Sequence, residues 1–361
     1  MLIIRMVIFG LGLAVVAGTV VSAIRTFVLP RSAPDPLTRI VFVLLRYLFE
    51  FRLRRTLAYA ERDRVLALYA PFGLLSLPPA WLALVLFGYT GLYWAVGVPV
   101  WEALRVSGSS LLTLGIASVE GLPGALLMFS EAALGLILVA LLIAYLPTMY
   151  SAFSKREAAV TLLEVRAGSP PSAVEMIKRY QRFHGLDRLS ELWMTWEVWF
   201  AELEESHTSL PALAFFRSPQ PDHSWVTASG AVMDAAALLS AAVDAPLDPR
   251  ASLCIRAGYL ALRRICDFFG LPYNPDPHYP AEPISVTRDE FEAACDDLAA
   301  QGVPLKPDRE RAWRDFAGWR VNYDTVLLAL CSVTSAPEAP WSSDRAPRFR
   351  IPALVPQQKP R

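Results

Sequence analysis

The residues best suited to chemistry lie in Trp101 to Ala117, a stretch that stands between two long apolar runs. Its helix-like part, Trp101 to Leu112, is too short to cross a hydrocarbon core of about 30 Å, which needs roughly 20 helical residues. The residues that follow, Thr113 to Ala117, begin with a Thr-Leu-Gly turn. Because non-helical backbone survives at membrane depth only where protein buries it or water lines it, this order predicts a re-entrant segment in the wall of a pore.

The order of apolar helix, short helix ending in Ser-Leu-Leu-Thr-Leu-Gly and second apolar helix resembles the pore module of the tetrameric potassium-channel superfamily, whose filter is T-V-G-Y-G. The resemblance covers about residues 66–150. It implies a pore loop at 101–117, a homotetramer, and a monovalent cation as the permeant ion. The filter would then be built from backbone carbonyls of Thr113, Leu114, Gly115, Ile116 and Ala117.

The filter-like residues depart from the family pattern at its outer end. Ile116 replaces the Tyr whose hydroxyl ties the family's filter to its supporting helix, and Ser118 replaces an Asp. Ala117 replaces a Gly, and an alanine at positive φ costs about 1–2 kcal/mol, so four subunits would each carry this cost or adopt a different outer filter. We therefore expect weakened potassium selectivity. The competing interpretation is a re-entrant or kinked helix that conducts nothing.

The second apolar run contains one charge, Glu131, which must face protein or water at that depth. We expect its partner on the back of the short helix, at Ser109, Ser110 or Thr113. Glu131 either supports the pore or is a protonated, structural carboxyl. Gly135, one turn later, either lets the inner helix bend as a gate or allows close packing.

Three spans are expected, in a first helix (1–30), near Pro79–Val98 and in an inner helix (125–150) of a pore module that covers 65–154. Trp81, Tyr89, Tyr93 and Trp94 are interpreted as an interfacial aromatic belt, with ordinary helix packing as the alternative. From residue 25 to 64 there are nine arginines against four acids, which favours a cytoplasmic location. The N-terminus would then lie outside an inner, plasma membrane. Residues 1–23 also fit a cleaved signal peptide.

The linker at 31–64 contains a basic amphipathic pattern, Leu37 to Leu57, with five arginines among apolar residues. Such a helix is expected to lie on the inner membrane surface. It could sense lipid or couple to a gate, or it could be a simple linker whose arginines contact anionic headgroups.

The second half of the chain is less apolar, and 155–361 carries 23 basic and 27 acidic residues, which argues against nucleic-acid binding. Its patterns are helical, so an all-helical cytoplasmic domain is expected at 155–334. Within it, 190–206 is expected to pack through its tryptophans, 226–243 to be a buried helix, and Thr287 to Glu290 to form a capping box. The four cysteines are expected to be reduced core residues. Residues 335–361 are expected to be disordered.

An enzyme of the second half that uses His207 and His223 is the weakest of three functional hypotheses. A metal site from His207 and His223 can be drawn, but their spacing matches no ligand motif, and no phosphate-binding loop is present. We expect no metal site and no cofactor. The sequence thus predicts an all-α membrane protein that acts as a cation channel regulated by its helical domain, through a regulator it does not identify. The alternative is a non-conducting scaffold or sensor with a pore-derived fold.

Overall fold

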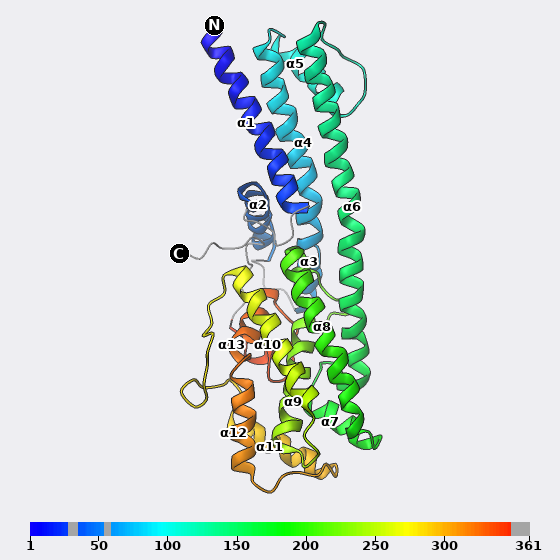
Figure 1. The fold of residues 1–361 in the computed structure, drawn as a ribbon, viewed down its shortest axis with the longest axis vertical. Helices are drawn as coiled ribbons and strands as arrows, with labels where there is room; N and C mark the ends of the chain where they lie inside the picture. Colours follow the sequence, from blue (N-terminus) through cyan, green and yellow to red (C-terminus); the bar gives the residue numbers. More distant parts are fainter. Residues whose placement is uncertain (28–34, 54–58, 348–361) are drawn as a thin grey trace. The chain divides into compact units, whose positions relative to one another are not determined.

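The chain folds into helices and the loops that join them (Figure 1). The computed structural model describes residues 1–27, 35–53 and 59–347, and these residues contain no β-strand, only an isolated bridge between Val243 and Leu305. The predicted all-helical class is therefore confirmed. Contacts divide the chain into two compact units, the first comprising residues 1–49 and 68–151 and the second 50–67 and 152–361.

The first unit is built on long apolar helices, α1 (Leu2–Phe27), α4 (Tyr69–Ala95) and the first part of α6 (Leu122–Ala167), with α5 (Val100–Leu111) and most of α2 (Pro36–Leu53). Helix α1 packs along α4. The two backbones come close at a pair of glycines, because a Cβ on Gly12 would lie 2.6 Å from the carbonyl oxygen of Gly88. Small residues at a crossing are a common way for apolar helices to pack in a membrane.

Among the described residues, four stretches are long and apolar enough to cross a membrane: Leu2–Phe27, Glu61–Ala95, Leu122–Ala167 and Trp225–Ala242. The first three overlap the spans predicted from the sequence. The fourth has 89% of its apolar window buried inside the protein, so it is a core helix, as expected for 226–243. Several helices of the chain are thus suited to a membrane.

The second unit packs around α9 (Trp225–Ala242), which is buried along most of its length. Helices α7, α10, α12 and α13 contact α9, and α8 packs along α10. The remaining bounds are α3 (Tyr59–Ala67), α7 (Ala173–Arg182), η1 (Leu186–Arg188), α8 (Leu189–Ser209), η2 (Pro211–Phe215), α10 (Pro249–Phe269), α11 (Arg288–Ala300), α12 (Arg309–Arg320), α13 (Asp324–Thr334) and η3 (Ser343–Arg345).

Several local predictions hold in the second unit. The aromatic residues of α8 are buried, including Trp193, Trp196 and Trp199. Thr287 and Glu290 form the predicted capping box at the start of α11, each side chain bonding the other residue's backbone N–H. The four cysteines are free and buried.

Two boundaries differ from the sequence prediction. Helix α6 does not end near residue 150 but continues to Ala167, because the residues that follow remain good helix formers. The stretch 335–347, which was expected to be disordered, is packed, and Trp341 and Ser342 are buried within it. Its Pro-rich composition marks a loop, and the buried tryptophan anchors that loop. The rest of the predicted tail, 348–361, lies outside the described residues.

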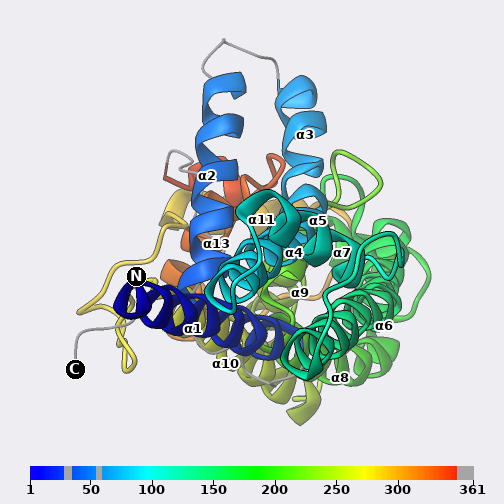
Figure 2. The same cartoon turned by 90° about the horizontal axis from the view of Figure 1, so that it is seen from above.

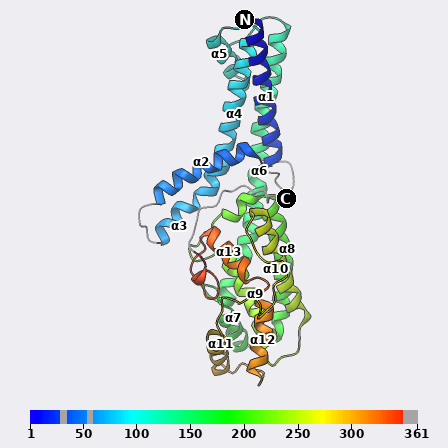
Figure 3. The same ribbon diagram turned by 90° about the vertical axis from the view of Figure 1, so that its left-hand side faces the viewer.

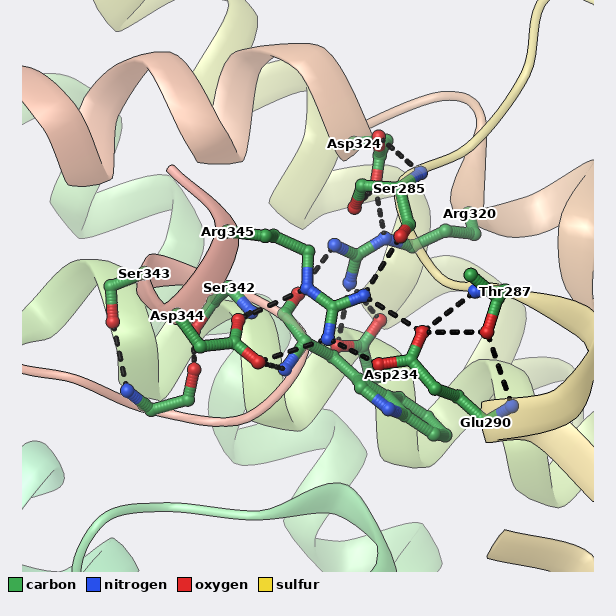
Figure 4. A network of polar contacts seen from close by, with 12 residues as sticks. Asp234, Ser285, Thr287, Glu290, Arg320, Asp324, Ser342, Ser343, Asp344 and Arg345 are labelled. Carbon is green, nitrogen blue, oxygen red and sulfur yellow. Dashed lines mark hydrogen bonds and ion pairs between the residues drawn. The ribbon is translucent and has the colours of Figure 1, made fainter. Parts of the chain in front are cut away.

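A buried arginine joins α9, α13 and this stretch (Figure 4). Arg320 is inaccessible to solvent, and its guanidinium donates to both carboxylate oxygens of Asp234 at 2.5 and 2.6 Å. It also donates to Asp324 at 2.7 Å and to the carbonyl oxygen of Trp341 at 2.6 Å. Although burial opposes its charge, the carboxylates of Asp234 and Asp324 raise the pKa of Arg320, so this arginine stays charged.

We expect Asp234→Asn to lower the free energy of unfolding of the full-length protein by about 3 kcal/mol, because it leaves a buried guanidinium short of one carboxylate. Denaturant unfolding in detergent, followed by tryptophan fluorescence, measures this loss. Asp315→Asn is the matched control, since the Arg311–Asp315 pair is exposed and its atoms lie 3.8 Å apart. Equal effects of the two substitutions would contradict the buried pair's role.

The second prediction concerns acid stability at Glu290. Hydrogen bonds from Arg345 lower the pKa of Glu290 from an ordinary 4.5 to about 2. A folded pKa below the unfolded one gives stability that is present above pH 4.5 and is lost as the pH falls toward 2. Glu290→Gln should therefore remove about 1 kcal/mol of acid-dependent stability in that window, a value reduced by solvent screening. Unfolding free energies across that window test this, with Asp289→Asn as a control expected to behave like the wild type.

Candidate functional site

The candidate site begins with α5, a helix of 12 residues that follows Pro99. At 1.5 Å per residue it is about 18 Å long, so it cannot cross a hydrocarbon core of about 30 Å. Helix α5 packs against α4. Residues 112–121 after it are not helical, and α6 begins at Leu122. The predicted succession of apolar helix, short helix, non-helical segment and second apolar helix is present.

The backbone after α5 takes an unusual course. Thr113 has φ +54° and Gly115 has φ +68°, whereas Ala117 is not at positive φ. Of the two outcomes considered for Ala117, a strained residue or a different outer conformation, the backbone shows the second, since the positive φ values are at Thr113 and Gly115. At Thr113 the conformation costs about 1–2 kcal/mol, and neighbouring contacts must offset that cost.

Ser109 supplies such contacts. Its hydroxyl accepts hydrogen bonds from the backbone N–H groups of Ile116 and Ala117, both at 3.0 Å. Its carbonyl oxygen accepts from the N–H of Leu114 at 2.8 Å. One side chain of α5 thus folds the filter-like segment back onto the end of its own helix. The neighbouring Ser110 is buried, and its carbonyl oxygen accepts from the N–H of Thr113 at 3.0 Å.

Glu131 is fully buried and hydrogen-bonded to two helices. The Ser107 hydroxyl lies 2.5 Å from Oε1, and the Tyr93 hydroxyl donates to Oε2 at 3.0 Å. The sequence prediction found the correct helix, α5, but the wrong residues, since neither Ser109, Ser110 nor Thr113 bonds this carboxyl among the contacts found. Ser107 also lies 3.0 Å from the carbonyl oxygen of Leu86.

The number of hydrogens at this site bears on the state of Glu131. Ser107 has a single hydroxyl hydrogen, yet it faces two acceptors, the carbonyl oxygen of Leu86 and the carboxyl of Glu131. A protonated Glu131 that donates to Ser107 satisfies both contacts, since Ser107 can then donate to Leu86. This arrangement favours the protonated, structural carboxyl over an ionised one.

Tyr93 was missed as a partner because the aromatic residues of α4 were interpreted as an interfacial belt. That interpretation is wrong for Trp81, Tyr89 and Tyr93, which are all buried. The Tyr89 hydroxyl donates to Ser130 at 2.9 Å, and the indole N–H of Trp81 donates to Ser22 at 3.1 Å. An amphipathic aromatic can place its polar tip on a buried partner as readily as in an interface, and the sequence does not separate the two.

Gly135 lies against the end of α5. A Cβ on this residue would fall 2.3 Å from the carbonyl oxygen of Leu111, closer than any side chain can sit. Of the two roles considered for Gly135, close packing has direct support from this contact.

His207 and His223, the two histidines considered for a metal site, have separate partners. Burial and the nearby Arg156 charge lower the pKa of His207, so its ring is neutral and contacts the carbonyl oxygen of Leu203 at 2.9 Å. The Nε2 of His223 lies 3.3 Å from a carboxylate oxygen of Glu164. Within the described residues no group of three or more His, Cys, Asp or Glu side chains is arranged to hold a metal ion.

Comparison with protein-family models, with curated proteins and with solved structures found no match to this chain.

The third prediction follows from the Ser109 hydroxyl. Ser109→Ala removes the acceptor of two backbone N–H groups, at a cost of about 1–3 kcal/mol to the local fold. The amides of Ile116 and Ala117 should then exchange with deuterium about 10- to 100-fold faster, as measured by mass spectrometry of the full-length protein. Ser130→Ala, on α6, serves as the control and should leave this segment's exchange unchanged. Unaltered exchange in Ser109→Ala would show that other contacts hold the segment.

Proposed function

We propose that this protein is a membrane channel or channel-like protein that conducts cations with weak potassium preference, with one filter segment (residues 112–118) from each of four chains. The observation that carries the proposal is the segment's backbone. Thr113 and Gly115 have positive φ and Leu114 between them does not. The left-handed turn at Thr113 ends α5 and, with the hydrogen bonds to Ser109, folds the segment back onto the end of that helix. A non-helical segment directly after a short helix is the position that the filter has in the resembled superfamily.

Assembly is supported by the apolar side chains of the segment. The apolar side chains of Leu114 and Ile116 are 56% and 70% exposed in the single chain. Neighbouring copies would cover these side chains, and a single segment cannot enclose an ion by itself. A closed ring of four copies answers both requirements.

Topology completes the proposal. The arginine excess before α4 favours a cytoplasmic linker, so the segment would enter from outside an inner membrane and the second unit would lie in the cytoplasm. The close packing of α1 on α4 supports a retained first helix. The second unit would regulate the pore.

The alternative is a non-conducting scaffold or sensor of the same fold. It is favoured by Ile116, which offers no hydroxyl to tether the outer part of the segment. It shares every contact described above with the channel, so only a measurement of current separates the two functions.

The fourth prediction is the current itself. Purified tetramers in a planar bilayer should carry cations, with a reversal potential under opposed potassium and sodium that indicates weak potassium preference. Thr113→Ala should lower conductance about tenfold, equivalent to about 1.4 kcal/mol, because it removes one ring of hydroxyl oxygens. Thr113→Ser keeps that ring and is the matched control. Tetramers that are confirmed by native mass spectrometry and carry no current would favour the scaffold, and a stable monomer would leave the segment without a pore.

A further inference from the structure

Helix α2 carries an apolar stripe that nothing in the described residues covers. The stripe consists of Ile40, Leu44, Tyr47, Leu48 and Phe51, each between 58% and 76% exposed. Their spacing of three, four, seven and eight residues places them on one face of a helix. Such a continuous apolar face on a surface helix calls for an occupant.

The opposite face of α2 is already packed. Phe42 is buried against α4, where a Cβ on Gly73 would fall 2.0 Å from its ring. The ring of Phe49 lies 5.2 Å from that of Tyr69. The face of α2 that carries Phe42 and Phe49 already packs against α4, so the exposed stripe is a second apolar face that does not belong to the protein core. Helix α2 is apolar on two sides, and only one side meets the protein.

The start of α2 is fixed to the first unit by a buried polar cluster. Asp35 accepts hydrogen bonds from the N–H of Thr38 at 2.8 Å and from the hydroxyl of Ser22, on α1, at 2.6 Å. The indole of Trp81, on α4, donates to the same Ser22 hydroxyl. This cluster caps α2 and ties it to two helices that are long enough to span a membrane.

The direction of α2 also matters. Figures 2 and 3 show α2 running across the direction of α1 and α4 instead of along it. It begins at Pro36, nine residues after α1 ends at Phe27. If α1 and α4 cross the bilayer, a helix that leaves the end of α1 crosswise lies in the plane of the membrane surface.

Arginines border the exposed stripe. Arg39 and Arg52 are exposed, and Arg46 lies on the same flank of the helix as Arg39. Helix α2 contains three arginines and one acidic residue, Glu50, so its net charge is positive. An apolar face with cationic borders matches a bilayer that has acyl chains below an anionic headgroup layer. A second α2 would bring three further arginines and only one acidic residue, so charge favours the bilayer over a second copy.

We propose that α2 is an anionic-lipid-binding helix, with its stripe among the acyl chains and with Arg39 and Arg52 on headgroup phosphates. This surface goes beyond the proposed channel function, and it exists whether or not the segment at 112–118 conducts.

The depth of α2 can be measured with an environment-sensitive fluorophore on single cysteines, since the four native cysteines are buried. The full-length protein carrying Leu44→Cys is labelled and reconstituted in vesicles of phosphatidylcholine and phosphatidylglycerol that contain a spin-labelled lipid quencher. Val198→Cys, on α8, is the matched control, because Val198 and Leu44 are similarly exposed at 61% and 59%. Ile143→Cys, on α6, reports insertion.

Quenching at Leu44 should exceed that at Val198 by about twofold or more, as expected for a side chain within the acyl region. Quenching at Ile143 but not at Leu44 overturns the lipid proposal alone, and it leaves the spanning helices in place. Crosslinking of Leu44→Cys between two copies, without lipid quenching, overturns it in favour of a second chain as the occupant.

The charge component is tested by the double substitution Arg39→Gln and Arg52→Gln in the Leu44→Cys background. Quenching should increase when phosphatidylglycerol is added to phosphatidylcholine, and the double substitution should abolish this increase but not the quenching in phosphatidylcholine alone. Arg264→Gln with Arg311→Gln, in the second unit, is the control pair. An increase that survives the α2 substitutions would overturn the assignment of these arginines.

Discussion

The buried carboxyl of Glu131 is the constraint on which the first unit depends. A carboxyl in an apolar helix needs hydrogen-bond partners from within the protein, and here they come from Tyr93 on α4 and Ser107 on α5. Three helices therefore meet at one side chain. One turn further along, Gly135 of α6 meets Leu111 of α5, four residues after Glu131 and Ser107 respectively. The same step on both helices keeps α5 and α6 in register, and this register places the end of α5.

The position of Ser109 follows from that register. Ser107 and Ser109 are two residues apart on α5, so they point to different sides of the helix. Because Ser107 faces Glu131, Ser109 is left to face the segment after Gly115, where its hydroxyl accepts from two backbone N–H groups. Ser107 thus holds α5 in place through Glu131, and Ser109 shapes the segment that follows the helix.

The sequence predicts what depends on local order. Hydropathy places α1, α4 and α6, the Thr287 capping box marks the start of α11, and the tryptophan spacing of α8 indicates a packed face. Long-range pairing is harder to predict, because a periodic pattern says which face is buried but not which residue it meets. For Glu131, the sequence therefore predicts a partner on the correct helix, α5, but not the correct serine, Ser107.

The second unit shows the same limit at α9. By length and hydropathy α9 could cross a membrane, and in its sequence only the charge of Asp234 opposes that interpretation. The structure resolves the case through Arg320, which lies 86 residues away and satisfies that carboxylate. Likewise, the stretch around Trp341 has the composition of a disordered tail, but it is packed. Arg320 donates to the carbonyl oxygen of Trp341, and Arg345, within the stretch, donates to Glu290 on α11. A long-range partner decides both cases.

Helix α6 is anchored separately on each side of Pro147. Before it, Glu131 is hydrogen-bonded within the first unit, and after it the buried Arg156 donates to the carbonyl oxygens of Leu213 and Phe216 at 2.7 and 2.6 Å in the second unit. Pro147 has no N–H to donate to Ile143, and its ring crowds that carbonyl. Bending α6 at Glu131 or at Arg156 would break hydrogen bonds of a buried polar group. The turn at Pro147 already lacks one backbone hydrogen bond. Bending of α6 therefore costs least at Pro147, four residues before the last residue of the first unit.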